Sequence, residues 1–486
     1  MSVKHLDEIV DEQQDEPGPP PEELDRLRKN QPTGWMHNSE LQNQNELAQR
    51  FIDRFDDDLR FVPKWGKWLH WDKKRWAEDH RSIRATRLGR RFAKTLWSEL
   101  AEVSQKSSRK SDANELFKFV RDANERKGIE AFVKLATTDE RIEVDVVELN
   151  LNPYLLNLKN GTLDLKTGEL REHRQDDKIT QLASVAYDEH AKCELWKATL
   201  QTIFGNDDEI IAFVQRLLGY SISGLQAEHI LPIAYGSGCN GKSTVTNTIL
   251  ALLGDYGGLA NEALLLGAKD AHPTEKAFLY QKRFVAISEP EQGARLRESR
   301  VKELTGDGTI TARRMHEDFW SFERTHTFWM STNHLPRIVG SDEGIWRRVK
   351  LIPFEVDVRK VTTPVPDLDK RLVADEGPGI LNWLIQGFLD WQAYGLFEPD
   401  KVKAAVSSYK SEEDELELFI AERCVVSGGC MVESERIFSS YQAWGGKMSR
   451  NLFGRKLGDK FTKDKPTSGD FRKKTLYHGI DLTNEN

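Results

Sequence analysis

The chain has 486 residues, of which 38% are hydrophobic and 30% are charged, as is typical of globular proteins with two to four domains. It contains no apolar run near the roughly 20 residues that a membrane span needs, and its acidic N-terminus lacks the order of a signal peptide, so we expect a cytoplasmic protein. The four cysteines show neither CxxC pairs nor zinc-finger spacing, and the net charge of -8 does not exclude nucleic acid, because cations can cluster in one domain.

The first segment, residues 1–58, is polar and acidic and carries a run of prolines. Such a composition can bury little apolar surface, so we expect a disordered arm, with room for a helix near 40–57. A binding segment for a partner is the functional alternative.

The next part, residues 59–225, mixes strand and helix signals. Aromatic and polar residues alternate over 60–78, and an Asn-Gly turn divides the alternating stretch 155–170, so both are expected to form β-hairpins. Residues 82–140 and 195–222 have apolar positions at helical spacing. We therefore predict an α+β domain whose aromatic side chains serve packing rather than base stacking.

Short apolar strands alternate with helical segments over residues 226–395. This order is typical of an α/β domain with a sheet covered by helices on both faces. Residues 396–486 are expected to form a separate small domain with helices, a strongly basic stretch and a short final strand pattern.

The clearest motif follows a strand expected at 230–235 and precedes a helix expected at 244–253. It fits G-x-x-x-x-G-K-[ST], in which glycines turn the backbone N–H groups toward phosphate oxygens. Lys242 would reach the β- and γ-phosphates of ATP, and Ser243 would ligate Mg²⁺. A chance glycine-rich turn is the alternative, but strand, motif and helix coincide. The predicted nucleotide-binding residues are Gly236, Ser237, Gly238, Cys239, Asn240, Gly241, Lys242, Ser243 and Thr244.

Acidic and amide side chains follow two further apolar strands. Glu289 ends the first of them and Glu291 comes two residues later, so one carboxylate would help to hold Mg²⁺ and the other would orient the attacking water. We predict Glu289 as the principal acid and as a metal ligand. Asn333 ends the other strand, where an amide can sense the γ-phosphate. The alternative for the carboxylates is a solvated loop.

Two arginines, Arg347 and Arg348, precede a fourth apolar strand at 349–354. Arginine binds phosphate oxygens in a fork, and a pair placed here could reach the nucleotide of a neighbouring subunit as an arginine finger. Taken alone, the pair would more often form surface salt bridges. Next to three other ATPase elements, we predict the catalytic role.

With these motifs in this order, the sequence resembles the superfamily 3 helicases, in particular the poxvirus D5-like branch of phage and plasmid primase-helicases. The stretches that carry the resemblance are LNLKNGTLDLKTGEL, GSGCNGKST, RFVAISEPEQG, VKELTGDGTITARRMHEDFWSF, MSTNHLP and SDEGIWRRVKLIPF, which together span roughly residues 150–355.

The resemblance implies an AAA+-like P-loop ATPase domain at 226–395, preceded by a D5-N-like α+β domain. It implies a homo-hexameric ring that travels 3′ to 5′ on single-stranded DNA, in a phage, plasmid or other mobile element of a bacterial host. It also implies a β-hairpin at about 309–325 that projects into the ring channel. The cations expected to contact DNA there are Lys302, Arg313, Arg314 and His316.

The sequence also departs from many relatives, because it shows neither room nor a motif for a primase domain. Priming would therefore need a separate primase. The final domain, residues 396–486, interleaves lysines and arginines with Phe453, Phe461 and Phe471, which suits a winged-helix-like domain that binds duplex DNA. A soluble basic face is the alternative.

The sequence thus predicts an ATP-hydrolysing DNA helicase of replication. A replication initiator that uses ATP only to assemble on DNA is the runner-up. A small-molecule kinase with a P-loop is a third class, which Asn333 and the pair Arg347 and Arg348 disfavour.

Overall fold

The computed structural model describes residues 42–106, 110–266, 273–291, 293–306, 308–315, 318–338, 343–466 and 474–483. The chain divides into two compact units. The first comprises the residues up to Leu151 together with His173–Gln181, and the second comprises Asn152–Glu172 and the chain from Leu182 onward. Within the described ranges, no helix is long and apolar enough to cross a membrane.

The first unit packs helices against a small antiparallel sheet of order β1-β2-β3. Both the hairpin expected within 60–78 and the helices expected within 82–140 are present. Three of the tryptophans in the hairpin region, Trp65, Trp68 and Trp76, are buried, which confirms their packing role. The elements are α3 (Gln44–Phe55), β1 (Leu59–Val62), β2 (Lys67–Trp71), β3 (Trp76–Glu78), α4 (Ile83–Lys106), α5 (Lys110–Asn124) and α6 (Arg126–Ala136).

Helix α3 lies within the predicted arm, residues 1–58, and confirms the helix expected near 40–57. The Asn43 side chain accepts a hydrogen bond from the Glu46 amide and so caps the helix. Leu47, Phe51 and Phe55 recur every fourth residue, and this buried stripe packs on α6. The few apolar residues of this polar stretch are spaced for a helix, which is why it folds. The remainder of the predicted arm, residues 1–41, lies outside the described residues.

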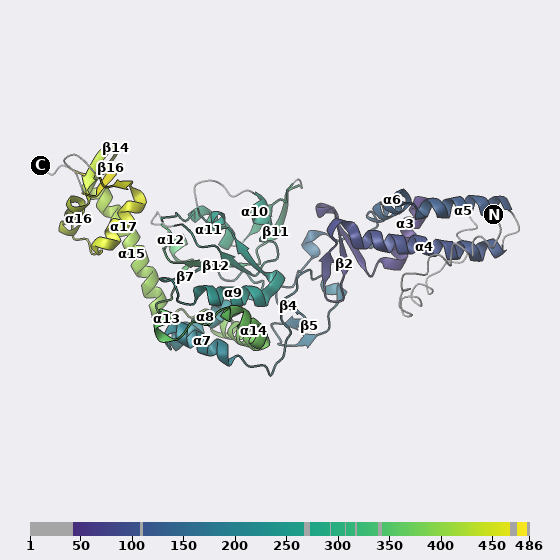
Figure 1. The fold of residues 1–486 in the computed structure, drawn as a ribbon, viewed down its shortest axis with the longest axis horizontal. Coiled ribbons are helices and arrows are strands. Elements are labelled where there is room, and N and C mark those ends of the chain that lie inside the picture. The colour runs from purple at the N-terminus through teal and green to yellow at the C-terminus, as the bar shows by residue number, and fades with distance from the viewer. Residues whose placement is uncertain are drawn as a thin grey trace. The chain divides into compact units, whose positions relative to one another are not determined.

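A five-stranded parallel sheet of order β13-β7-β12-β9-β8 forms the centre of the second unit (Figure 1). All strands point the same way, so their carboxyl ends meet at one edge. This confirms the predicted α/β sheet. The strands are β7 (Leu231–Tyr235), β8 (Gly257–Ala260), β9 (Phe284–Ile287), β12 (Thr327–Thr332) and β13 (Val349–Pro353).

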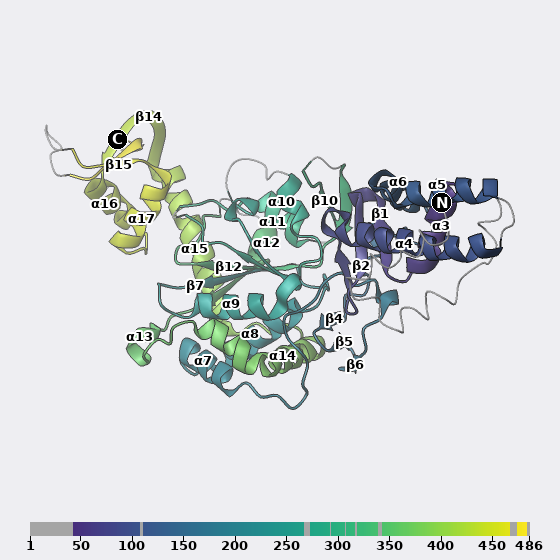
Figure 2. The same ribbon diagram turned by 45° about the vertical axis from the view of Figure 1, so that its right-hand side comes forward.

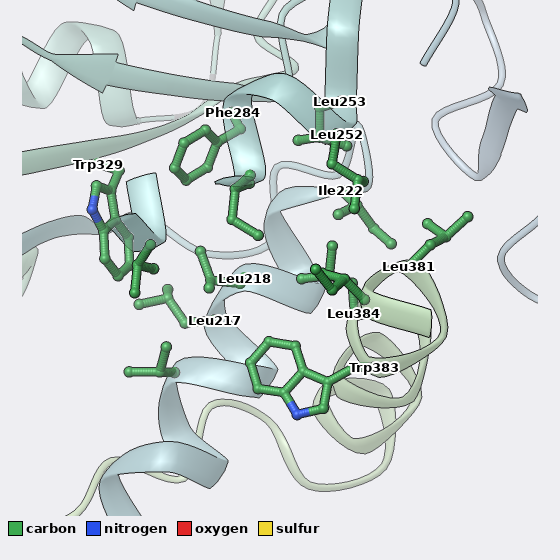
Figure 3. Packing of buried hydrophobic residues seen from close by; sticks show 14 of the residues in the cluster. Leu217, Leu218, Ile222, Leu252, Leu253, Phe284, Trp329, Leu381, Trp383 and Leu384 are labelled. Atoms are coloured by element: carbon green, nitrogen blue, oxygen red, sulfur yellow. The ribbon is translucent and has the colours of Figure 1, made fainter. Parts of the chain in front are cut away.

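Helices cover both faces of this sheet, as the two views agree (Figures 1 and 2). On one side lie α8 (Asp208–Ser221), α9 (Lys242–Leu253) and α14 (Leu368–Tyr394), and on the other lie α10 (Pro273–Ala277), α11 (Glu298–Thr305) and α12 (Glu343–Trp346). Figure 3 shows the core on the first side, where Leu218, Trp329 and Trp383 bring α8, β12 and α14 together. This core fixes the strand ends that carry the motifs.

The two compact units do not divide at the predicted boundary, residue 225, because residues 152–172 and 182–225 belong to the second unit. The buried Arg283 at the start of β9 donates to the carbonyls of Leu155 (2.6 Å) and Ile222 (2.8 Å). Its guanidinium also lies 4.5 Å from the ring of Tyr256. The elements of this region are β4 (Leu155–Leu158), β5 (Gly161–Asp164), β6 (Leu170–Arg171) and α7 (Glu194–Phe204), followed by α8.

The C-terminal part begins with α15 (Asp400–Arg423), which packs on β13 before it enters a second small core. That core joins α16 (Ser434–Ala443) and α17 (Arg450–Lys460) to an antiparallel sheet of order β14-β16-β15. The strands are β14 (Cys424–Glu433), β15 (Lys463–Asp464) and β16 (Leu476–Leu482). We call residues 400–483 the C-terminal module.

Candidate functional site

The loop between β7 and α9 has the backbone shape that its glycines require. A Cβ atom at position 236 would lie 2.1 Å from the carbonyl oxygen of Phe354, and one at position 241 would lie 2.4 Å from Ile203 Cδ1. Gly241 also has a φ of +86°, which favours glycine. The two glycines of the motif are therefore needed for close approach of the backbone to β13 and α7.

Lys242 is buried and reaches back across the loop. Its ammonium donates to the carbonyl oxygen of Gly236 (2.6 Å), to Asn240 Oδ1 (3.0 Å) and to Asn333 Oδ1 (2.9 Å). Burial lowers the pKa of Lys242, and the negative charge of Glu289 opposes this effect. The lysine thus joins the loop to the residue predicted as a sensor.

Asn333 stands between the lysine and an acid. Its side chain accepts from Lys242, and its backbone amide donates to Glu289 Oε1 at 3.0 Å. Asn333 follows β12, which lies between β7 and β9 in the sheet. The strand before Glu289, β9, is therefore not adjacent to β7, the strand that leads into the loop. Both predicted carboxylates are exposed, and Glu289 is the one with a bond into this chain of contacts.

The remaining residues of the loop are mostly exposed at the N-terminus of α9, where a ligand could bind. Ser237, Gly238, Cys239 and Ser243 are exposed, and a Cβ added at Gly238 would meet nothing within 4 Å. Asn240 is buried, and its amide donates to the Phe354 carbonyl at 2.8 Å. These exposed groups and the amides of the first helical turn form a donor set that suits an anion.

The two arginines before β13 differ in their surroundings. Arg347 is exposed, and its backbone amide continues helix α12 by donating to Glu343. Arg348 instead donates to Thr305 Oγ1 (3.1 Å) and to the Gly344 carbonyl (2.7 Å), which ties α12 to α11. Arg348 thus has an internal contact that the sequence did not reveal, whereas Arg347 is exposed, and the finger stays a prediction.

A hairpin does form where the resemblance predicts one, from β10 (Thr309–Ala312) and β11 (Trp320–Glu323). Its inward residues Trp320 and Phe322 pack on Tyr280, with ring centroids 4.8 and 5.4 Å apart. At the tip, the guanidinium of Arg313 lies 5.0 Å from the ring of Phe319, which is 60% exposed. Arg314 is also on the tip and half-buried, Lys302 lies on α11, and His316 lies outside the described residues.

The cations of the C-terminal module fall into two groups. Lys456 pairs with Glu413 at 2.6 Å and Lys460 pairs with Glu417, and both lysines are largely covered by α15. Others line an open groove between α17 and β15, so these are the ones placed to meet a phosphate backbone. The groove is lined by Ser434, Arg450, Asn451, Gly454, Arg455, Lys463, Asp464, Lys465, Thr475 and Tyr477. Phe471, which the sequence analysis counted in the patch, lies outside the described residues.

Sequence reasoning missed one pair that braces the site. Thr246 Oγ1 on α9 lies 3.1 Å from Ser331 Oγ on β12, two residues before Asn333. The pair thus holds the strand end against the helix that follows the loop. In the sequence, the one local sign of this contact is the hydroxyl of Thr246, one helical turn after Lys242.

Two family models match the chain. Residues 48–205 match the family described as D5 N terminal like, and residues 234–348 match a family of unknown function, DUF5906. The second match spans the loop, both carboxylates, Asn333 and the two arginines.

Curated relatives come from large DNA viruses. A protein of Acanthamoeba polyphaga mimivirus named as a candidate helicase is 26% identical over 301 residues, which cover 57% of this chain and 31% of that protein. One of African swine fever virus named as a candidate primase is 26% identical over 326 residues, covering 61% and 34%. The chain therefore spans about a third of the length of these relatives. The apo structure of the NrS-1 C terminal region aligns with 61% of this chain and 78% of its own, with 15% identity and a TM-score of 0.36.

Proposed function

We propose that this chain, which matches the D5 N terminal like family over residues 48–205, is an ATP-driven DNA helicase that works as a homo-hexameric ring. The observation that carries the proposal is the direct chain of contacts from Lys242 through Asn333 to Glu289 at one edge of a parallel sheet. Such a chain couples the lysine that would bind phosphate to the amide that would sense the γ-phosphate and to the acid that would hold Mg²⁺.

The residues fit an ATP–Mg²⁺ complex. The exposed loop 237–239 and the first turn of α9 offer N–H donors for phosphate, and Lys242 offers the cation. Ser243 and Glu289 are the side chains that would hold Mg²⁺, which supplies charge neutralisation on the phosphates. With Glu289 at the metal, Glu291 would be the carboxylate that orients the attacking water.

The strand order supports an AAA+-like motor, because β12 with its sensor residue separates the loop strand β7 from the acid strand β9. The exposed Arg347 suits a finger that acts on a neighbouring subunit, which requires a closed ring. The resemblance further supports 3′-to-5′ travel. A strand-displacement assay with substrates tailed at either end, run beside electron microscopy of the same sample, tests the helicase, its direction and the ring.

A replication initiator that uses ATP only to assemble is the second candidate. Two features of the C-terminal module favour it. Its cationic groove suits duplex DNA, and its elements follow the order of winged-helix domains: helix, strand, two helices and two strands. Hydrolysis of ATP stimulated by single-stranded DNA separates the two functions, because an assembly switch needs no such stimulation.

The hairpin tip yields a prediction about unwinding. Changing both Arg313 and Arg314 to alanine removes two cations that each subunit would present to DNA in the channel. We expect the rate of strand displacement to fall at least about tenfold while basal ATP hydrolysis stays within about twofold. The matched control replaces the exposed neighbours Arg126 and Lys127 of α6. Normal unwinding by the tip variant would place the DNA path elsewhere.

The groove yields a prediction about salt. Deleting residues 396–486 would also remove α15 from β13, so point variants are the sharper test. The triple change Arg450→Ala, Lys463→Ala and Lys465→Ala should weaken duplex binding and reduce the slope of log K against log salt by about 2 to 3, near one unit for each phosphate that is no longer neutralised. Fluorescence anisotropy across a salt titration measures this, with Arg436→Ala as a control outside the groove. An unchanged slope would mean that the basic face only aids solubility.

A further inference from the structure

The two loops that follow the acid strand and the sensor strand are joined to each other. The amide of Arg337 donates to the Ala294 carbonyl, and the amide of Leu296 donates to the Arg337 carbonyl, both at 2.8 Å. One loop follows β9 and carries Glu289 and Glu291, and the other starts at Asn333 after β12. Because these bonds form a short bridge of strand type, a shift of either loop carries the other with it.

A buried tyrosine of the C-terminal module holds the second loop. The hydroxyl of Tyr409, on α15, donates to the carbonyl oxygen of Pro336, three residues after Asn333. The same ring packs edge-on against Trp346 with centroids 5.2 Å apart, and Trp346 directly precedes Arg347. One side chain, 2% exposed, therefore contacts both the sensor loop and the helix that carries the proposed finger.

Charged groups of the same module hold the joined loops from the other side. Glu417 on α15 lies 3.6 Å from the Arg337 guanidinium, and Asp459 on α17 is so close to Gly293 that an added Cβ would lie 3.3 Å from its carboxylate. Burial raises the pKa of Asp459, which the nearby Arg337 opposes, and burial lowers the pKa of Lys460 beside them to about 8. Arg337, Asp459 and Lys460 line one small pocket together with Gly293 and Tyr409.

The same helix α17 faces the cationic groove. Arg455 lines both the cavity beside the loops and the groove, and Lys456 and Asp459 continue the helix toward the loops. A ligand that moves or orders α17 at the groove therefore acts on the groups that contact Gly293 and Arg337.

We infer that the C-terminal module positions the catalytic loops, with Tyr409 and Arg337 as positioning residues for ATP hydrolysis, so that the module sets the rate of the motor. The inference rests on the proposed ATPase function. It assigns α15 and α17 a second role, in addition to any contact with DNA: they keep Asn333 and Glu289 aligned with Lys242. Release of the loops lowers turnover without removing any group that binds the nucleotide.

The test compares two tyrosines that lose the same atom. Tyr409→Phe deletes the bond to Pro336, whereas Tyr441→Phe deletes a bond to Glu415 (2.6 Å) and one from the Met448 amide (2.9 Å) inside the module. Both tyrosines are buried, and thermal unfolding measures the loss of stability in each variant, which should be at least as large in Tyr441→Phe because it loses two bonds. We expect kcat for ATP to fall about fivefold in Tyr409→Phe with KM little changed, because one hydrogen bond is removed. Tyr441→Phe should keep both values within about twofold.

Hydrogen exchange of the free protein provides the readout that needs no ATPase activity. The amides of Leu296 and Arg337 should exchange faster in Tyr409→Phe and at the normal rate in Tyr441→Phe. Unchanged exchange in Tyr409→Phe, or equal loss of kcat in both variants, overturns the inference. If the unaltered chain hydrolyses no ATP, the proposed function fails, and the exchange experiment still decides whether the module positions the loops.

Discussion

Replacing Lys242 with alanine will lower the rate of ATP hydrolysis at least tenfold, a loss of about 1.4 kcal/mol or more in transition-state stabilisation. The ammonium is the one side-chain cation within the loop, and it also bonds Asn333. Alanine therefore removes the charge that would face the β- and γ-phosphates and releases the sensor side chain at the same time. A steady-state assay at saturating ATP measures the effect.

The control for this variant is Lys127→Ala, which changes an exposed lysine on α6 in the other unit. Thermal unfolding of both variants separates lost chemistry from lost structure. Near-normal turnover in a folded Lys242→Ala protein would refute the assignment of the loop as a nucleotide site.

Arg347→Ala should lower ATP hydrolysis by about a hundredfold or more, since arginine fingers contribute about 10³ to 10⁵ in related phosphoryl transfers. If the residue acts on a neighbouring subunit, mixing this variant with Lys242→Ala will restore part of the activity. Some interfaces in the mixed ring then contain both an intact Lys242 and an intact Arg347. The measurement is ATP turnover as a function of the mixing ratio.

Arg348→Ala is the companion variant, because it removes the bonds to Thr305 and Gly344 within its own chain. It should lower the melting temperature and should not complement Lys242→Ala beyond what its own residual activity adds. Absence of any recovery with Arg347→Ala, in samples shown to contain mixed rings, would mean that Arg347 works within its own subunit or has no catalytic role.

Local signals predicted the strand-loop-helix of the nucleotide site, because glycine conformation and helix start depend on residues close together in sequence. The hairpin of β4 and β5 was predicted from an Asn-Gly turn, but Gly161 begins β5 and pairs with Leu158, so the turn residues are Lys159 and Asn160. Glu289 and Asn333 were predictable as strand ends. Their link through the Asn333 amide was not, since it needs β12 to lie beside β9, and strand order is a long-range property.

The contacts that the sequence did not reveal involve partners distant in the sequence. Arg348 and Arg347 are adjacent and chemically alike, and only the position of Thr305 on α11 decides which of them is held inside. Lys456 and Lys460 were counted in a basic patch, but acids on α15 neutralise them. Tyr409 gave no signal at all, because its partner is the backbone of Pro336, whose carbonyl has no sequence signature.

The anchoring of Arg283 to Leu155 and Ile222 has a bearing on how such proteins can be recombined. A splice at residue 225 would give the motor a buried guanidinium with no carbonyl to receive it, a defect that costs about 3 to 5 kcal/mol when a buried charge is left without its partners. A junction at 151, where the two units divide, keeps both acceptor carbonyls with the motor, but the chain returns to the first unit at His173–Gln181. A single cut in the chain therefore cannot separate the first unit from the motor, so the two must be exchanged together in a chimaera.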